Sequence, residues 1–205
     1  MSQASAEPRW TEAEFFGWLD GQEGRFEFVD GRPVAMTGGT QRHDRIVTNL
    51  IVALGGRLPP DGPCRPGSPD AGVRVPAGNV RYPDVLVDCG PFRDDERAAS
   101  EPRLVVEVLS PSTRAFDQAR KLDEYKSVPS LAHVLLLDPD GPRATLHTRG
   151  ADGAWAAAAL DGAGAVVPLD ALGLALPLAE AYRGLPPRRP PRLLALVPED
   201  DGEGG

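Results

Sequence analysis

The sequence contains few lysines, cysteines and histidines, and each shortage narrows the possible functions. Only two of its 22 basic residues are lysines, and its only cysteines are Cys64 and Cys89. Two cysteines supply neither a zinc-ligand spacing nor a disulfide framework, so we expect two unpaired cysteines that are buried or have no role. Two of the three histidines, His133 and His147, occur in strand-like segments without cysteine or histidine partners, which argues against zinc.

The chain also lacks a long apolar run, a Walker-type phosphate loop and an excess of basic residues. No stretch could span a bilayer and the first residues contain no apolar signal segment, so we expect a cytoplasmic protein without membrane contacts. The 30 acidic and 22 basic residues give a net charge of −8, which argues against a protein that coats nucleic acid. A surplus of arginine at residues 25–57 is compatible with local phosphate contacts and equally with a solvated helix face.

Length and composition indicate one domain with two flanking segments. A chain of 205 residues is typical of a single domain, which we place at residues 10–183. Residues 1–9 are polar and are expected to be flexible. Residues 184–205 are rich in proline and arginine, then in glycine and acidic residues, and are expected to form a disordered tail.

Helical and strand-like patterns are interspersed through this domain. Thr11 begins a capping-box pattern, Asp30-Gly31 favours a hairpin turn, and Ser112 or Thr113 can cap a later helix. Helices are predicted over residues 11–20, 41–58, 112–126 and 178–182. Strands are predicted over residues 25–29, 33–36, 72–75, 80–87, 104–109, 131–137 and 143–148, with smaller ones near 155 and 166–167. This mixture predicts an α/β or α+β domain with a mixed central β-sheet flanked by helices.

Two carboxylates lie in segments that otherwise look like buried strands. Glu107 interrupts the apolar run at residues 104–109, and Asp84 lies within residues 82–87. Burying an unpaired, ionised carboxylate is costly, so each must be paired, protonated or bound to a cation. Together they would form an oxygen-rich site suited to Mg²⁺ or Mn²⁺. Two structural salt bridges would explain the same pattern equally well.

The helix that follows adds a charged face to these carboxylates. Asp117, Lys121 and Glu124 have the spacing i, i+4, i+7 and share one side of the helix. Lys121 directly follows an arginine in a chain that otherwise uses arginine almost throughout, which suggests that an ammonium group is needed there. A compact ammonium can hold a water molecule or a phosphate oxygen. Alternatively, Asp117 and Lys121 form a surface pair that adds only a few tenths of a kcal/mol.

Together these segments resemble the Uma-two family of restriction endonucleases, which belongs to the PD-(D/E)xK nuclease superfamily. The resemblance covers about residues 10–183 and rests on Pro83-Asp84, Glu107-Val108-Leu109-Ser110-Pro111-Ser112-Thr113, Asp117, Lys121, Tyr125, and residues 25–31, His43 and 134–139. It implies a restriction-endonuclease-like core in which Asp84 and Glu107 are the motif carboxylates and Glu27 joins their cluster. Leu109 replaces the superfamily lysine, which in this family has moved to the next helix, where Lys121 matches it.

The resemblance implies a metal-dependent endonuclease that hydrolyses nucleic-acid phosphodiesters, with DNA as the expected substrate. Asp84, Glu107 and the main-chain carbonyl of Val108 would hold one or two Mg²⁺ or Mn²⁺ ions. Lys121 would orient the attacking water or neutralise charge in the transition state. Glu27 would bind a second metal or position its water.

Two further residues match the family without a settled role. Tyr125 would buttress Lys121 or touch the phosphate, although simple packing is the commoner role of such a tyrosine. His43 lies at a helix start, where a solvent-facing side chain is the usual outcome.

Two other functions remain open. The chain could be a catalytically degenerate nuclease-fold module for binding or assembly, which its acidic charge favours and the joint presence of Asp84, Glu107 and Lys121 disfavours. It could also be an enzyme that acts on a phosphoester other than nucleic acid. Binding of Mn²⁺ and cleavage of plasmid DNA separate these functions. A homo-oligomer such as a dimer is compatible with the sequence.

Overall fold

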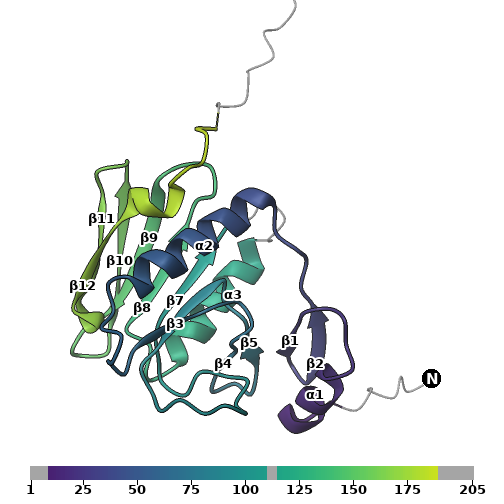
Figure 1. The fold of residues 1–205 in the computed structure, drawn as a ribbon. Helices are drawn as coiled ribbons and strands as arrows, with labels where there is room; N and C mark the ends of the chain where they lie inside the picture. The colour runs from purple at the N-terminus through teal and green to yellow at the C-terminus, as the bar shows by residue number, and fades with distance from the viewer. Residues whose placement is uncertain (1–8, 110–114, 189–205) are drawn as a thin grey trace, which may run out of the picture.

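The structure is a computed structural model that describes residues 9–109 and 115–188, and of residues 115–117 it describes the backbone alone. Most of the two flanking segments, and the predicted cap at Ser112 or Thr113, therefore lie outside the described residues. The described strands form a six-stranded sheet, a four-stranded sheet and a two-stranded ribbon (Figure 1). None of the described helices is long and apolar enough to cross a membrane.

The helices are α1 (Glu12–Leu19), α2 (Gln41–Gly55) and α3 (Ala115–Ser127), with short 3₁₀ segments η1 (Asp170–Leu172) and η2 (Leu178–Tyr182). The strands are β1 (Phe26–Val29), β2 (Arg32–Ala35), β3 (Arg65–Gly67), β4 (Val73–Arg74), β5 (Val80–Arg81), β6 (Val85–Asp88), β7 (Pro102–Val108), β8 (His133–Leu137), β9 (Arg143–Arg149), β10 (Trp155–Asp161), β11 (Val166–Leu169) and β12 (Leu174–Pro177).

The N-terminal helix and hairpin form as the sequence predicts. Thr11 caps α1 by accepting a hydrogen bond from Glu14 N (3.2 Å), and the Glu14 carboxylate accepts one from Thr11 N (2.7 Å). This reciprocal capping satisfies two backbone donors at the helix start. In the turn between β1 and β2, Asp30 and Gly31 have φ angles of 52° and 77°, because a two-residue hairpin turn of this type needs two left-handed residues.

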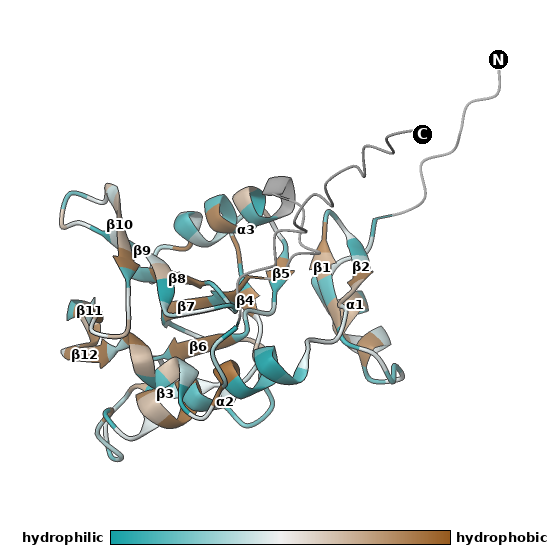
Figure 2. Ribbon diagram, turned by 90° about the horizontal axis from the view of Figure 1, so that it is seen from above, coloured by the Kyte–Doolittle hydropathy of each residue, from teal (hydrophilic) through white to brown (hydrophobic). Residues whose placement is uncertain are grey.

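The six-stranded sheet has the order β10-β9-β8-β7-β6-β3 and contains both kinds of pairing. β7 pairs antiparallel with β6 and parallel with β8. Successive residues of β7 face opposite sides, so Val106 packs in one core with Leu50 of α2 while Val105 packs in another with Tyr125 of α3. Figure 2 shows α3 and α2 on opposite sides of β7 and β8. The predicted mixed sheet flanked by helices is confirmed.

One predicted strand is two strands in different sheets. The sequence predicts a single strand over residues 80–87, whereas β5 belongs to the four-stranded sheet and β6 to the six-stranded sheet. Pro83 lies at the break, and a proline has no N–H group with which to continue a strand ladder. Asp84 therefore lies at the joint between the two sheets rather than inside a strand.

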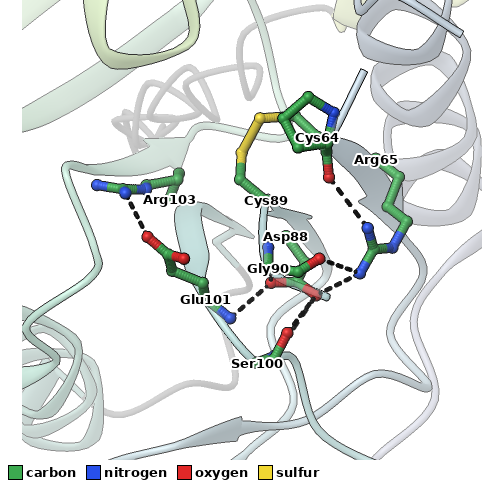
Figure 3. The surroundings of a disulfide bond; sticks show 9 residues. Cys64, Arg65, Asp88, Cys89, Gly90, Ser100, Glu101 and Arg103 are labelled. Carbon is green, nitrogen blue, oxygen red and sulfur yellow. Dashed lines mark hydrogen bonds and ion pairs between the residues drawn. A yellow bond between two sulfur atoms is a disulfide. The ribbon is translucent and has the colours of Figure 1, made fainter. Parts of the chain in front are cut away.

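The prediction that Cys64 and Cys89 are unpaired is wrong, because a disulfide joins them (Figure 3). β3 pairs antiparallel with β6 in a register that puts Arg65 opposite Asp88, so the two cysteines are the next facing positions. Arg65 and Asp88 also form an ion pair across the strands at 3.0 Å. β3 has only three residues, Arg-Pro-Gly, and this sequence carries no strand pattern. The pairing therefore could not be predicted from cysteine spacing.

Removal of this disulfide is expected to lower the free energy of unfolding while the native fold is kept. The double variant Cys64→Ala/Cys89→Ala opens a covalent loop that spans 25 residues. Loop-closure entropy gives such a crosslink a value of about 3.5 kcal/mol. Urea unfolding followed by circular dichroism measures the change, and the chemically reduced wild type, which should lose a similar amount, is the matched control. Detection of two free thiols in unfolded, unreduced wild type would contradict the assignment.

Candidate active site

The adjoining ends of β6 and β7 bring the two predicted carboxylates together. Val85 lies opposite Val106 in the antiparallel register. Continued by one residue, this register places Asp84 beside Glu107, because facing residues of an antiparallel pair are near neighbours. Both carboxylate side chains keep some exposure, 15% for Asp84 and 17% for Glu107. This end of the sheet is therefore acidic and largely buried, with a small part of each carboxylate side chain open to solvent.

Asp84 is held by a main-chain amide and by a histidine. Its Oδ2 atom accepts a hydrogen bond from Val108 N (2.8 Å) and lies 3.1 Å from His43 Nε2. The hydrogen bond to Asp84 favours the charged imidazole and raises the pKa of His43, although burial acts in the opposite direction. His43 lies in the first turn of α2, and its contact with Asp84 corrects the expectation that it faces solvent.

Glu107 points toward α3 and contacts two of its side chains. Tyr125 Oη donates a hydrogen bond to Glu107 Oε1 (2.7 Å), and Lys121 Nζ lies 3.8 Å from the same oxygen. Lys121 forms a closer ion pair of 2.9 Å with Oε1 of Glu27, which comes from β1. The structure thus gathers the four predicted side chains around the end of β7.

Burial makes Glu107 a weak acid for a glutamate. Removal from water raises the pKa of Glu107 from 4.5 to about 7, against the opposing charge of Lys121, and the neighbouring Asp84 adds to the rise. Burial by itself would lower the pKa of Lys121, but the charges of Glu107 and Glu27 outweigh it, so this pKa is raised. Lys121 is therefore charged at neutral pH, where Glu107 changes its protonation.

A buried arginine that sequence analysis does not single out lies behind this cluster. Arg81 of β5 is 2% exposed and forms ion pairs with Glu27 (Nη1–Oε2, 2.8 Å) and with Glu124 (Nε–Oε2, 2.5 Å). Arg81 could have been identified in the sequence by the same criterion as Asp84, because it is a charged residue within an apolar, strand-like segment. Asp117, which is predicted on the helix face of Glu124, lies outside the described side chains.

Asp84 and Glu107 offer oxygen ligands suited to a hard divalent cation. Their hydrogen bonds and ion pairs with described residues use Asp84 Oδ2 and Glu107 Oε1, which leaves Asp84 Oδ1 and Glu107 Oε2 without partners in that part of the chain. Mg²⁺ is commonly bound through one or two carboxylates and retains several waters, so this donor set fits it. Within the described residues, no three acidic, histidine or cysteine side chains are grouped as a metal site. The donor set is thus small, as Mg²⁺ allows.

A small cavity of about 60 Å³ lies beside this cluster. Glu107, Val108, Lys121 and Gln118 are among its lining residues. Gln118 precedes Lys121 by about one helical turn. The sequence does not single it out, but its spacing from Lys121 could have indicated that the two side chains share a helix face. A cavity of about 350 Å³ lies near the disulfide and Asp88, toward the opposite end of β6. Cavity size therefore does not identify the site.

Some of the arginines at residues 25–57 form contacts with other parts of the protein. Arg42 donates hydrogen bonds to the main-chain oxygens of Pro139 (2.6 Å) and Pro186 (2.8 Å). Arg57 forms an ion pair with Glu180, with Nη1–Oε2 at 2.9 Å. These two partly exposed arginines therefore have structural contacts, Arg42 with two distant loops and Arg57 with η2.

Comparison with known proteins identifies the family of the chain. Residues 12–179 match the Uma2 (Uma-two) family, which is described as "Putative restriction endonuclease". The chain belongs to the Uma2 family. This match confirms the resemblance predicted from the motifs.

Two relatives of this Uma2 protein are described as uncharacterized. It is 34% identical over 150 residues to the uncharacterized protein slr1290 of Synechocystis, across 72% of this chain and 78% of the relative. It is 27% identical over 163 residues to the uncharacterized protein sll1609 of the same organism, across 73% and 86%.

A solved structure from Anabaena variabilis, described as a "putative nuclease", has a similar fold. The TM-score is 0.67 with 17% sequence identity, across 82% of this Uma2 chain and 96% of that chain. At this level of identity the similarity supports the fold alone.

The Glu107→Gln variant is expected to be more stable than wild type at alkaline pH when divalent metal is absent. Because the folded protein raises the pKa of Glu107 from 4.5 to about 7, ionisation destabilises the fold increasingly as the pH rises through this interval. Glutamine avoids this cost, which is at most about 3–4 kcal/mol since each pKa unit corresponds to about 1.4 kcal/mol.

Urea unfolding in the presence of a chelator at pH 4.5 and pH 8 measures this difference. We expect the two proteins to be similar at pH 4.5 and the variant to unfold at higher urea at pH 8. Asp123→Asn, which changes an exposed carboxylate of α3, is the control and should show no such gain. Equal stability of wild type and Glu107→Gln at both pH values would contradict the buried, crowded position of Glu107.

Proposed function

We propose that this protein is a metal-dependent endonuclease that hydrolyses phosphodiester bonds of nucleic acid, with DNA as the expected substrate. The observation that carries the proposal is the position of Lys121. Its ammonium lies between Glu27 and Glu107, at the sheet end where Asp84 is placed beside Glu107. Two carboxylates with a buried lysine are the groups needed to bind a hard cation and to hold a phosphate next to it.

Asp84 and Glu107 would hold the metal, together with the main-chain carbonyl of Val108. When bound, Mg²⁺ or Mn²⁺ would polarise a phosphoryl oxygen, lower the pKa of the attacking water and stabilise the leaving oxygen. Hydrogen bonds restrict the orientation of both carboxylates. His43 and the Val108 amide hold Asp84, and Tyr125 holds Glu107. Each carboxylate can therefore present its other oxygen in a fixed direction.

Lys121 would supply positive charge and a hydrogen-bond donor to the reacting phosphate or the attacking water. An ammonium group has three N–H donors, and Glu27 and Glu107 can take two of them. The remaining donor is available to a phosphate oxygen or a water. Because Lys121 is only 16% exposed, its charge is less screened than that of a surface lysine.

The contacts of Glu27 favour a role in positioning Lys121 over a role as a second metal ligand. Glu27 Oε1 accepts from Lys121 and from Tyr82 N (3.3 Å), and its Oε2 accepts from Arg81. Both oxygens are therefore engaged by protein donors. Tyr125 is similarly committed, since its side chain is buried and its hydroxyl donates to Glu107. This geometry favours support of Glu107 over contact with the phosphate.

Two measurements test the proposal directly. Titration calorimetry with Mn²⁺ tests whether the protein binds metal, and cleavage of supercoiled and linear DNA with Mg²⁺ or Mn²⁺ tests the reaction, with a chelator as the control. Absence of both would favour the binding or assembly module. Metal binding without cleavage of DNA or RNA would favour another phosphoester as substrate.

The Lys121→Ala variant is expected to lose cleavage while its Mn²⁺ affinity stays close to that of wild type. Removal of a single donor to transition-state charge lowers kcat by roughly 10²–10³-fold, and a cation is not a metal ligand. Asp84→Ala should lose both metal binding and cleavage. Lys121→Arg should restore little activity, since the planar guanidinium cannot place one donor where the ammonium lies.

Lys126→Ala is the matched control, because Lys126 is the other lysine of the chain and lies on the same helix. It should leave kcat, Mn²⁺ affinity and melting temperature near their wild-type values. Cleavage by Lys121→Ala at the wild-type rate would show that Lys121 acts only in a structural ion pair.

A further inference from the structure

Arg81 joins the proposed site to a firmly held carboxylate on α3. Its guanidinium donates from Nη1 to Glu27 Oε2 and from Nε to Glu124 Oε2, so the two carboxylates occupy different edges of one rigid plane. Almost no part of Arg81 reaches solvent, and a buried charge of this kind is stable only with fixed partners. The bridge therefore couples the position of Glu27, on β1, to that of α3.

Glu124 is the fixed end of this bridge. In addition to Arg81, it accepts hydrogen bonds from Asn79 Nδ2 (2.9 Å) and from Arg120 Nε (3.0 Å). Arg120 in turn pairs with Asp30 at 2.7 Å, in the turn after β1. The Glu124 carboxylate is therefore held from three directions, and its described hydrogen bonds do not include Lys121.

Glu27 is the end of the bridge that faces the site. Arg81 binds its Oε2, while its Oε1 is directed to Lys121. Arg81 and Lys121 thus share the carboxylate of Glu27, and each limits how far the carboxylate can move toward the other. Lys121 remains close enough to Glu107, at 3.8 Å, to interact with both acids.

We propose that Arg81 is a positioning residue of the active site, which holds Glu27 against Glu124 and thereby fixes the place of the Lys121 ammonium between Glu27 and Glu107. This inference rests on the proposed function, and it assigns Arg81 no contact with substrate or metal. A guanidinium is required because its planar array of donors reaches two carboxylates at once. Without it, the buried Glu27 keeps Lys121 as its remaining cation and draws the ammonium away from Glu107.

The chain offers a direct view of this effect because it contains only two lysines. Isotope labelling of lysine gives two side-chain NMR signals, from Lys121 and Lys126, and loss of one signal in Lys121→Arg assigns them. The test variant is Arg81→Gln, recorded without metal or substrate. We expect the Lys121 signal to move and the Lys126 signal to stay in place.

A second variant keeps the test valid if Arg81→Gln does not fold. Glu124→Gln leaves Arg81 in place but weakens the fixed end of the bridge, so the Lys121 signal should move here as well. The matched control is Arg74→Gln, because Arg74 also bridges two carboxylates, Glu12 (2.7 Å) and Glu96 (3.0 Å), at a partly exposed position away from Lys121. The control should leave both lysine signals unchanged.

Kinetics give a second readout that a purely structural role would not affect. If misplacement of Lys121 impairs the chemical step, Arg81→Gln should lower kcat by on the order of 10²-fold with little change in KM for DNA. If Arg81 had only a structural role, its replacement would lower the melting temperature and leave kcat of the folded protein unchanged. Arg74→Gln should retain wild-type kcat.

The outcomes separate this inference from the proposed function. An unmoved Lys121 signal in folded Arg81→Gln or Glu124→Gln, or an equal movement in Arg74→Gln, would overturn the positioning role even if the wild type cleaves DNA. A moved Lys121 signal in a protein that never cleaves nucleic acid would support the coupling of Arg81 to Lys121 and would refute the nuclease function alone.

Discussion

Buried charge is the constraint on which the arrangement of this protein depends. Glu27 and Arg81 lie almost wholly out of solvent, and Glu107 and Lys121 are largely buried beside them. Such groups destabilise a fold unless each meets a partner of opposite charge. Their partners come from β1, β5, β7 and α3, so both larger sheets and the helix must be in place before the charges are matched. The same requirement fixes the side chains of the proposed site.

The break at Pro83 gives this network its geometry. Were residues 80–87 one continuous strand, Arg81 and Asp84 would belong to the same sheet. Instead the chain leaves the four-stranded sheet after Arg81 and enters the six-stranded sheet at Val85. Arg81 can thus pair with Glu27 of β1 while Asp84 lies beside Glu107 of β7. The strand break at Pro83 thus places the charges of Arg81 and Asp84 at two different sheets.

Much of the fold could be predicted from local patterns, because capping, hairpin turns and apolar spacing act over a few residues. Asp84 and Glu107 could be identified since a carboxylate among apolar strand residues needs a partner. The partners themselves depend on contacts between distant segments, such as β5 with β1 and α2 with the start of β6. For this reason the contact of His43 with Asp84, the bridge made by Arg81 and the disulfide beside the paired strands β3 and β6 were not predictable. The domain limits at residues 10 and 183 stay a prediction.

The two kinds of cation in the network are suited to different tasks. Arg81 uses a planar group to join two carboxylates that belong to separate elements, and an ammonium could not span them with the same geometry. Lys121 presents a compact charge at the end of a flexible stem, which can lie between two acids and still offer a donor to a third group. Under the proposed function, the need for a single, directed donor would explain why this chain, whose other cations are nearly all arginine, has a lysine at this largely buried position. Under the two proposals, both positions meet one condition: Arg81 holds Glu27 in place, while Lys121 keeps a donor for a third group.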